Sequence, residues 1–320
     1  MKSIYHFFRL IRILNLVVIG VTMTVVEVFL LRYNSIPPQG YFESFCFTSY
    51  YSHELNGFYL LLISTLLIAA AGNIINDYFD VKADRVNKPK KLIIGKYIKR
   101  RWAMVMHWSF NLMGFILALY IGYELQNIWI PIVSFLSINL LWFYSAYFKR
   151  KPLIGNVMVA LLLGVIPIYV LIFNEPNFFT LNDYLIVPIF YISILAFLMN
   201  LVRELVKDIQ DVRGDLRLNA QTFPIKYGIK KTKYLIVYNS IVLLFIMLCF
   251  IGYGFEVGSN VNLEMIFFNE TFFYLLFVSL GFYTLSLILT VMSNKIKTYK
   301  IASLLLKLSM ILVLLTPLFL

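Results

Sequence analysis

The sequence predicts an all-α, polytopic membrane protein with nine transmembrane helices. Of its 320 residues, 61% are hydrophobic and only 14% are charged, and the mean hydropathy of +0.81 lies above the ordinary soluble range. Apolar runs of about 20 residues, the length that crosses a bilayer as a helix, recur along the whole chain. Because these runs are continuous and do not alternate, they indicate helices and exclude a membrane barrel.

The apolar runs follow one another without a soluble domain between them, so we expect one membrane-embedded domain over residues 1–320. The first run has no small-residue cleavage site and should remain as an anchor. The predicted spans are 13–32, 57–76, 103–122, 128–147, 153–173, 185–205, 234–254, 271–292 and 301–320.

The basic residues predict the orientation. Of 28 Lys and Arg residues, 26 fall in the N-terminal segment and in alternate loops, whereas segments 33–56, 123–127, 174–184 and 255–270 contain none. By the positive-inside rule, the N-terminus is cytoplasmic. The same rule explains the net charge of +12 without a nucleic-acid partner. We expect a multi-pass protein of the cell membrane (plasma or inner membrane) and leave its oligomeric state open.

Two acidic clusters dominate the predicted cytoplasmic side. They continue the second and sixth spans, and both contain the pattern D-x-x-D-x-x-x-D. With about 100° per helical residue, this spacing puts the three carboxylates within roughly 60° of one another on one helix face. The clusters are Asp77, Asp80 and Asp84, and Glu204, Asp208, Asp211 and Asp215.

Carboxylates held this close repel one another unless a cation neutralises them. Mg²⁺ is commonly bound by one or two carboxylates together with substrate phosphates. A solvated helix end is the alternative for one such cluster, but two clusters with identical spacing favour Mg²⁺ and a diphosphate. Basic residues flank both clusters, as a phosphorylated substrate requires, although positive-inside topology alone would also put them there. They are Arg85, Lys88, Lys90, Lys91, Arg203, Lys207, Arg213 and Arg217.

A diphosphate at the mouth of a hydrophobic bundle indicates an allylic isoprenoid substrate. Mg²⁺ would stabilise the leaving diphosphate as a Lewis acid, and an acceptor would then attack the carbocation. The residues expected to carry this chemistry are Asp77, Asp80, Asp84, Asp208, Asp211 and Asp215.

These motifs resemble those of the UbiA superfamily of intramembrane prenyltransferases, which carry N-D-x-x-D-x-x-x-D and D-x-x-x-D. Here the two patterns occupy 76–84 and 211–215, and the resemblance covers essentially the whole chain. It implies a nine-helix UbiA-like bundle with both motifs on the cytoplasmic side of a central cavity, and two Mg²⁺ ions. The metal residues it implies are Asp77, Asp80, Asp84, Asp211 and Asp215, supported by Asn76 and Asp208.

Three stretches, 12–15, 144–156 and 203–228, look most like the digeranylgeranylglyceryl phosphate synthase branch of the superfamily. The resemblance implies geranylgeranyl transfer to geranylgeranylglyceryl phosphate in lipid biosynthesis, with Arg12, Lys149 and Lys207 at the diphosphate or the acceptor phosphate. The full substrate-binding set that we expect is Arg12, Asn15, Asn73, Asn76, Asn87, Tyr144, Tyr147, Lys149, Arg203 and Lys207.

Departures from the family pattern keep a second acceptor class open. Ile13 stands where the family usually has Pro, Lys90-Lys91 replaces an Arg-Pro pair, and Phe223 stands where T-L-P has Leu. An aromatic acceptor, as in quinone synthesis, is therefore the alternative.

Two other protein classes fit less well. A cation transporter would hold its acids near the bilayer midplane on broken helices, and these clusters lie at helix ends. A CDP-alcohol phosphotransferase would have Gly after the second Asp of its motif, where this chain has Val81. Two charges within predicted spans, Glu27 and Lys307, are functional candidates by position, but their roles stay open.

Overall fold

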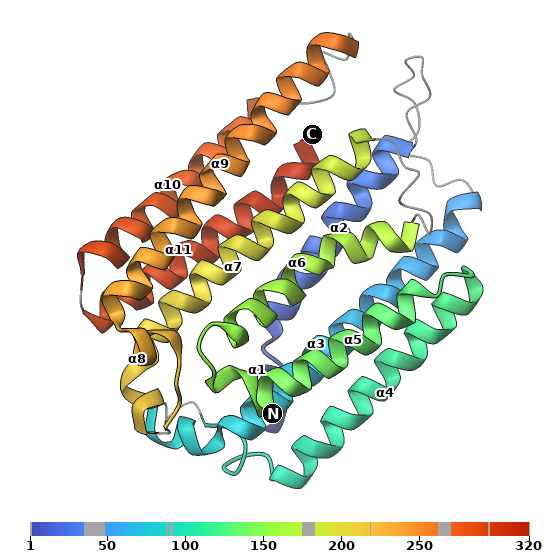
Figure 1. Ribbon diagram of the computed structural model, residues 1–320. Coiled ribbons are helices and arrows are strands. Elements are labelled where there is room, and N and C mark those ends of the chain that lie inside the picture. The colour runs from blue at the N-terminus through green and yellow to red at the C-terminus, as the bar shows by residue number, and fades with distance from the viewer. Residues whose placement is uncertain are drawn as a thin grey trace. The chain divides into compact units, whose positions relative to one another are not determined.

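The computed structural model describes residues 2–34, 49–87, 89, 92–174, 183–217, 219–261, 270–293 and 295–319. Within these residues the regular elements are helices, apart from one isolated β-bridge between Ile94 and Ile98 (Figure 1). The all-α prediction is confirmed. The elements are α1 (Lys2–Leu10), α2 (Ile13–Asn34), α3 (Ser49–Asn87), α4 (Arg100–Glu124), α5 (Trp129–Ala146), η1 (Phe148–Arg150), α6 (Ile154–Asn174), α7 (Asp183–Arg217), α8 (Phe223–Tyr227), α9 (Ile229–Val261), α10 (Glu270–Met292), α11 (Ile296–Leu315) and η3 (Thr316–Phe319).

In the described part of the chain, nine helices are long and apolar enough to span a membrane, which confirms the nine predicted spans. The helices α3 and α7 are much longer than predicted, with 39 and 35 residues. Their final turns are polar and carry the two acidic clusters. The helix α3 ends at Asn87, just before Lys88-Pro89, because a residue that precedes proline is disfavoured in the α conformation.

The chain divides into two compact units, Met1–Tyr147 with Tyr169–Asn182, and Phe148–Ile168 with Asp183–Leu320. A single functional domain over 1–320 stays a prediction. In the first unit, α3 packs against α2, α4 and α5. In the second, α7 packs against α9 and α11, and α10 packs against α11.

Small residues let α3 and α4 approach closely in the first unit. The Ser64 hydroxyl donates a 2.7 Å hydrogen bond to the Gly114 carbonyl. A Cβ at Gly114 would lie 2.8 Å from Cγ1 of Ile68 and 3.0 Å from the Ser64 carbonyl oxygen. Close backbone approach at small residues and interhelical hydrogen bonds are what hold helices together in lipid, where apolar burial contributes little.

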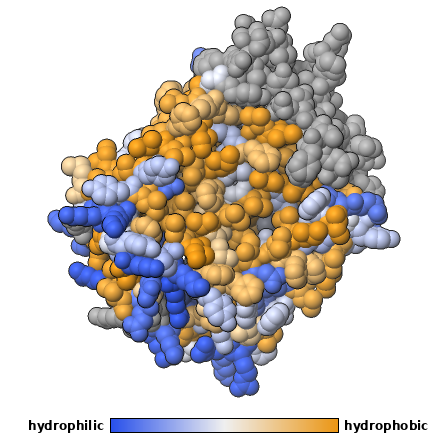
Figure 2. Space-filling view, in the orientation of Figure 1, coloured by the Kyte–Doolittle hydropathy of each residue, from blue (hydrophilic) through white to orange (hydrophobic). Residues whose placement is uncertain are grey.

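Hydroxyl groups connect the helices of the second unit. Ser279 on α10 and Ser309 on α11 share a 2.9 Å hydrogen bond between their hydroxyls. Tyr283 on α10 and Ser240 on α9 share another of the same length. Figure 2 shows hydrophobic residues over most of the visible face and hydrophilic residues gathered at its lower left, where α8 and the beginning of α9 lie. Polar side chains therefore pair inside, and the apolar exterior suits lipid.

Replacing Gly114 with alanine should lower the unfolding temperature, because the added methyl group would push α4 away from the α3 backbone. Overpacking of this kind costs about 1–3 kcal/mol, which thermal unfolding in detergent should register as a shift of several degrees. The matched control is Gly281→Ala on α10, where a Cβ would meet nothing within 4 Å. Equal unfolding temperatures for the two variants would contradict the proposed close approach.

Candidate active site

The first acidic cluster lies on the last turns of α3, as predicted. Asp77, Asp80 and Asp84 are half-buried there, whereas Ile74 and Val81 of the same turns are buried in the core of the first unit. The apolar side of the helix end thus fixes the acidic side in place.

Arg12 is paired with the first aspartate of this cluster. Its Nη2 lies 2.6 Å from Oδ1 of Asp77, and Asp80 and Tyr144 are also within electrostatic reach of the guanidinium. Burial works to lower the pKa of Arg12, but the two carboxylates outweigh it and the pKa is raised. Four residues predicted for the site, from α3, α5 and the α1–α2 junction, thus come together.

The α1–α2 junction explains how Arg12 reaches the carboxylates. Arg12 adopts the left-handed conformation, with φ of 54°, so the chain breaks between two helices without glycine or proline. The break leaves carbonyls without helical donors, and Nδ2 of Asn73 on α3 donates a 2.9 Å hydrogen bond to one of them, the Ile11 carbonyl. Asn73 therefore ties the junction to α3, a structural contact beside its predicted substrate role.

The second acidic cluster begins with an ion-paired group inside the membrane-spanning part of α7. Glu204 is only 13% exposed, lies 3.1 Å from Nη1 of Arg203, and forms an ion pair with Lys207 one turn later. Lys149 on η1 is also within electrostatic reach of Glu204. One carboxylate thus organises three of the predicted substrate-binding cations.

Asp208 is held by a residue from another helix. Its Oδ2 accepts a 2.9 Å hydrogen bond from Nδ2 of Asn156 on α6. The neighbouring Gly155 lets η1 pack onto the beginning of α6, since a Cβ there would lie 2.8 Å from the Phe148 carbonyl oxygen and 3.0 Å from Cα of Lys149. Gly155 and Asn156 therefore set the position of Lys149 and Asp208 together.

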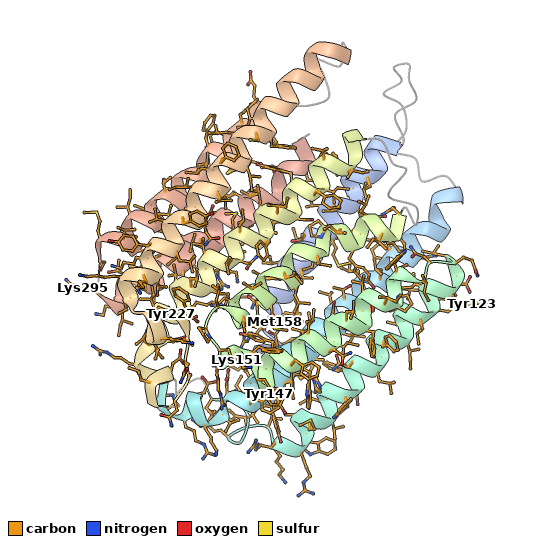
Figure 3. The ribbon with its side chains drawn as sticks, viewed as in Figure 1. Tyr123, Tyr147, Lys151, Met158, Tyr227 and Lys295 are labelled. Atoms are coloured by element: carbon orange, nitrogen blue, oxygen red, sulfur yellow. The ribbon has the colours of Figure 1, made fainter. Side chains whose placement is uncertain are left out.

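The remaining predicted residues are placed less tightly by the structure. Asn76 is buried on α3, Asn15 is half-buried on α2, and Asp211 and Asp215 are half-buried on α7. Tyr147, at the end of α5, is 63% exposed (Figure 3). The side chain of Asn87 lies outside the described part of the structure, as do Lys88, Lys90, Lys91 and the side chain of Arg217.

The acidic helix ends suit a metal ion whose coordination is completed by a substrate. Seven residues of helix rise about 10 Å, so one cluster cannot close three carboxylates around one ion. In agreement, no group of three or more His, Cys, Asp or Glu side chains within the described ranges is placed to hold a metal ion. Mg²⁺ accepts one or two carboxylates and takes its other ligands from phosphates and water. The donor chemistry therefore fits Mg²⁺, and the individual ligands stay predictions.

Membrane-spanning helices and an acidic motif on each of two helix ends define a polytopic membrane protein with candidate sites for a metal-bound anionic substrate. The chain belongs to the UbiA prenyltransferase family, whose profile matches residues 41–311. The resemblance drawn from the motifs is confirmed, and the protein is a prenyltransferase.

Curated relatives include two digeranylgeranylglyceryl phosphate synthases. The one from Methanobrevibacter smithii is 34% identical over 63% of this chain and 69% of its own length. The one from Thermococcus kodakarensis is 32% identical over 57% of this chain and 60% of its own length. The matches thus span about two thirds or less of these relatives.

Solved structures share the fold over nearly the full chain. A digeranylgeranylglyceryl phosphate synthase in membranes matches with a TM-score of 0.66 and 22% identity, over 99% of this chain and 98% of its own. A UbiA homologue from Archaeoglobus fulgidus, bound to DMAPP and Mg²⁺, matches with a TM-score of 0.54 and 15% identity, over 96% and 98%. These likenesses confirm the UbiA-like helical fold.

Sequence reasoning missed two organising contacts. Glu204 was counted in the acidic cluster but not as the partner of Arg203 and Lys207, although its i, i+3 spacing to Lys207 on a helix is a signal for such a pair. Asn156 was noted only as part of a family-like stretch, and no spacing in the sequence links it to Asp208, 52 residues away.

Asn156→Leu should slow prenyl transfer roughly ten- to hundredfold, because a hydrogen bond to a charged group contributes about 1.5–3 kcal/mol. Transfer of a radiolabelled prenyl group by purified protein measures the loss. Asn139→Leu is the control, since half-buried Asn139 donates to the Phe135 carbonyl of its own helix. If both variants kept the same rate, Asn156 would have no part in positioning Asp208.

Proposed function

We propose that the protein transfers a geranylgeranyl group from geranylgeranyl diphosphate to geranylgeranylglyceryl phosphate, with Mg²⁺ as cofactor. The observation that carries the proposal is the pair of D-x-x-D-x-x-x-D motifs on the ends of α3 and α7, each accompanied by cations. Carboxylates bind the metal and cations bind the phosphates, which is the combination a metal-bridged diphosphate requires.

The comparisons support the substrates of this proposal. The curated relatives are named digeranylgeranylglyceryl phosphate synthases, and UbiA homologues of the same fold have been solved with DMAPP or GPP and Mg²⁺. We infer two Mg²⁺ ions bound by Asp77, Asp80, Asp84, Asp211 and Asp215 together with substrate phosphates, supported by Asn76 and Asp208.

In the proposed reaction, the bond between the allylic carbon and the diphosphate oxygen breaks and its electron pair leaves with the diphosphate. A new bond forms between the allylic carbon and the acceptor hydroxyl oxygen, and the hydroxyl proton passes to diphosphate or solvent. Bound Mg²⁺ supplies Lewis-acid stabilisation of the leaving group.

The residues of this chain bind and orient the reactants. In this proposal Arg12, which lies beside Asp77 and Asp80, binds a diphosphate oxygen delivered to those carboxylates. Lys207 and Lys149 are kept near the second motif by Glu204. Asn156 holds the Asp208 carboxylate in one orientation. Fixed charges of this kind stabilise developing negative charge without reorganising during the reaction.

The proposed location is the cell membrane, with the active site on the cytoplasmic side. The distribution of Lys and Arg supports this orientation, and the diphosphate head group of the donor would reach the helix ends from that side.

The first test is an assay in detergent or nanodiscs with radiolabelled geranylgeranyl diphosphate and Mg²⁺. Geranylgeranylglyceryl phosphate and 4-hydroxybenzoate are offered in separate reactions. We expect the label to be transferred to the glycerophosphate acceptor. Transfer should stop when EDTA is added and resume with excess Mg²⁺. Transfer only to the aromatic acid would assign the protein to quinone synthesis. Transfer that persists in EDTA would exclude a requirement for Mg²⁺.

Asp77→Asn and Asp211→Asn should each reduce transfer at least a hundredfold, because each removes a negative charge from a site that binds a divalent cation. Both variants should still purify as folded protein, since both positions are half-buried at helix ends. Glu124→Gln, at an exposed acid that ends α4, is the charge-matched control and should keep full activity. Wild-type rates in either aspartate variant would remove that carboxylate from the mechanism.

A further inference from the structure

The second unit brings two cations together within membrane-spanning helices. Arg203 belongs to the span Ile186–Leu216 of α7 and Lys307 to the span Ile296–Leu315 of α11, and these helices pack against each other. Lys307 lies within electrostatic reach of Arg203. Like charges in a medium of low dielectric constant repel strongly. Two cations close together within membrane-spanning helices are therefore candidates for a functional site.

The Arg203 guanidinium has a donor available for a ligand. Its Nη1 is used by Glu204 at 3.1 Å, whereas its Nε is buried and, within the described part of the chain, has no hydrogen-bond partner. A buried donor without an acceptor costs about 1–3 kcal/mol. An anion that accepts from Nε would remove this cost.

The charge balance around Arg203 also favours an anion. Glu204 forms ion pairs with Arg203 and Lys207 and lies within electrostatic reach of Lys149. Lys307, near Arg203, adds a further positive charge. Asp208, the residue after Lys207, lies within electrostatic reach of Glu204, Lys207 and Asp215. With the three carboxylates counted, these named groups comprise four cations and three anions, so an anionic ligand would offset the remaining positive charge.

Lys307 is poorly placed for the usual role of a membrane lysine. Lysines that extend to the headgroups lie near helix ends, whereas Lys307 is eleven residues into α11, about 16 Å along the helix. Lys307 itself is half-buried, between buried Leu306 and exposed Leu308. At this depth a charge is stabilised by groups of the protein or by a bound ligand.

We propose that Arg203 and Lys307 bind the phosphate of the acceptor, and so select a phosphorylated acceptor over a neutral lipid alcohol. A phosphomonoester carries nearly two negative charges and three acceptor oxygens, which suit one guanidinium edge and one ammonium. Arg203 precedes Asp208 by five residues on α7, about 8 Å along the axis. The acceptor phosphate then binds farther into the membrane-spanning part of α7 than the second aspartate motif. That motif binds the diphosphate of the donor. This inference rests on the proposed function.

The test is Lys307→Met, which removes the charge and keeps an unbranched side chain suited to a membrane helix. Steady-state kinetics are measured with geranylgeranylglyceryl phosphate and with geranylgeranylglycerol, the same lipid without its phosphate, as substrate or competitive inhibitor. We expect the KM for the phosphorylated acceptor to rise at least tenfold, as the loss of a charge-assisted hydrogen bond predicts. The KM for geranylgeranyl diphosphate and the affinity for geranylgeranylglycerol should stay within twofold.

Two variants control for structural effects. Lys300→Met changes the same residue type on the same helix at an exposed position and should leave all constants unchanged. Lys307→Arg keeps the charge and should keep the acceptor KM near the wild-type value.

Each other outcome has a distinct meaning. An unchanged acceptor KM in Lys307→Met, or an equal loss with geranylgeranylglycerol, would overturn the inference while leaving the proposed function intact. A selective rise in the KM for the diphosphate would overturn it by assigning the cations to the other substrate. Only the absence of transfer to any glycerophosphate by the wild-type protein would refute the proposed function itself.

Discussion

A charge within a membrane-spanning helix needs a partner from the protein, because lipid offers neither counterions nor hydrogen bonds. Glu204 is therefore paired with Arg203 and Lys207. Glu27, buried in α2, accepts a 2.7 Å hydrogen bond from Asn174, and Asp208 accepts one from Asn156. These contacts determine which faces of α2, α6 and α7 turn inward. The same requirement concentrates polar chemistry at a few fixed places instead of spreading it along the helices.

The length of α3 and α7 follows from where the chemistry must be performed. A helix of about 20 residues crosses the hydrocarbon layer, and both helices are longer by several turns. The aspartates lie in the final turns of these long helices, which keeps them on a rigid element. A loop would also bring carboxylates to the surface, but it would not hold three of them on one face. Rigid helix ends keep the carboxylates of each cluster in a fixed spacing for a metal-bridged ligand.

The sequence predicted what depends on local pattern and missed what depends on long-range contact. Continuous apolar runs predicted the nine spans, and helical spacing placed Asp77, Asp80 and Asp84 on one face of α3. The break at Arg12 was not predictable, because its left-handed conformation has no glycine or proline to signal it. The bond between Asn156 and Asp208 joins two helices whose packing no local pattern encodes. The substrate roles of the predicted site residues stay predictions, since they depend on ligands and not on the fold.

The two ion pairs near the acidic motifs differ in how easily they can separate. Arg12 is 41% exposed and Asp77 is 19% exposed, so the cation reaches solvent while the carboxylate is half-buried. Arg12 can therefore leave Asp77 for a ligand of opposite charge when a metal ion takes its place at the carboxylate. Glu204 is 13% exposed, and breaking a buried pair leaves a charge without compensation. Its two cations are thus held in place while Arg12 remains exchangeable. The first unit thus carries an exchangeable cation beside its aspartates, and the second unit carries a fixed group of charges beside its own.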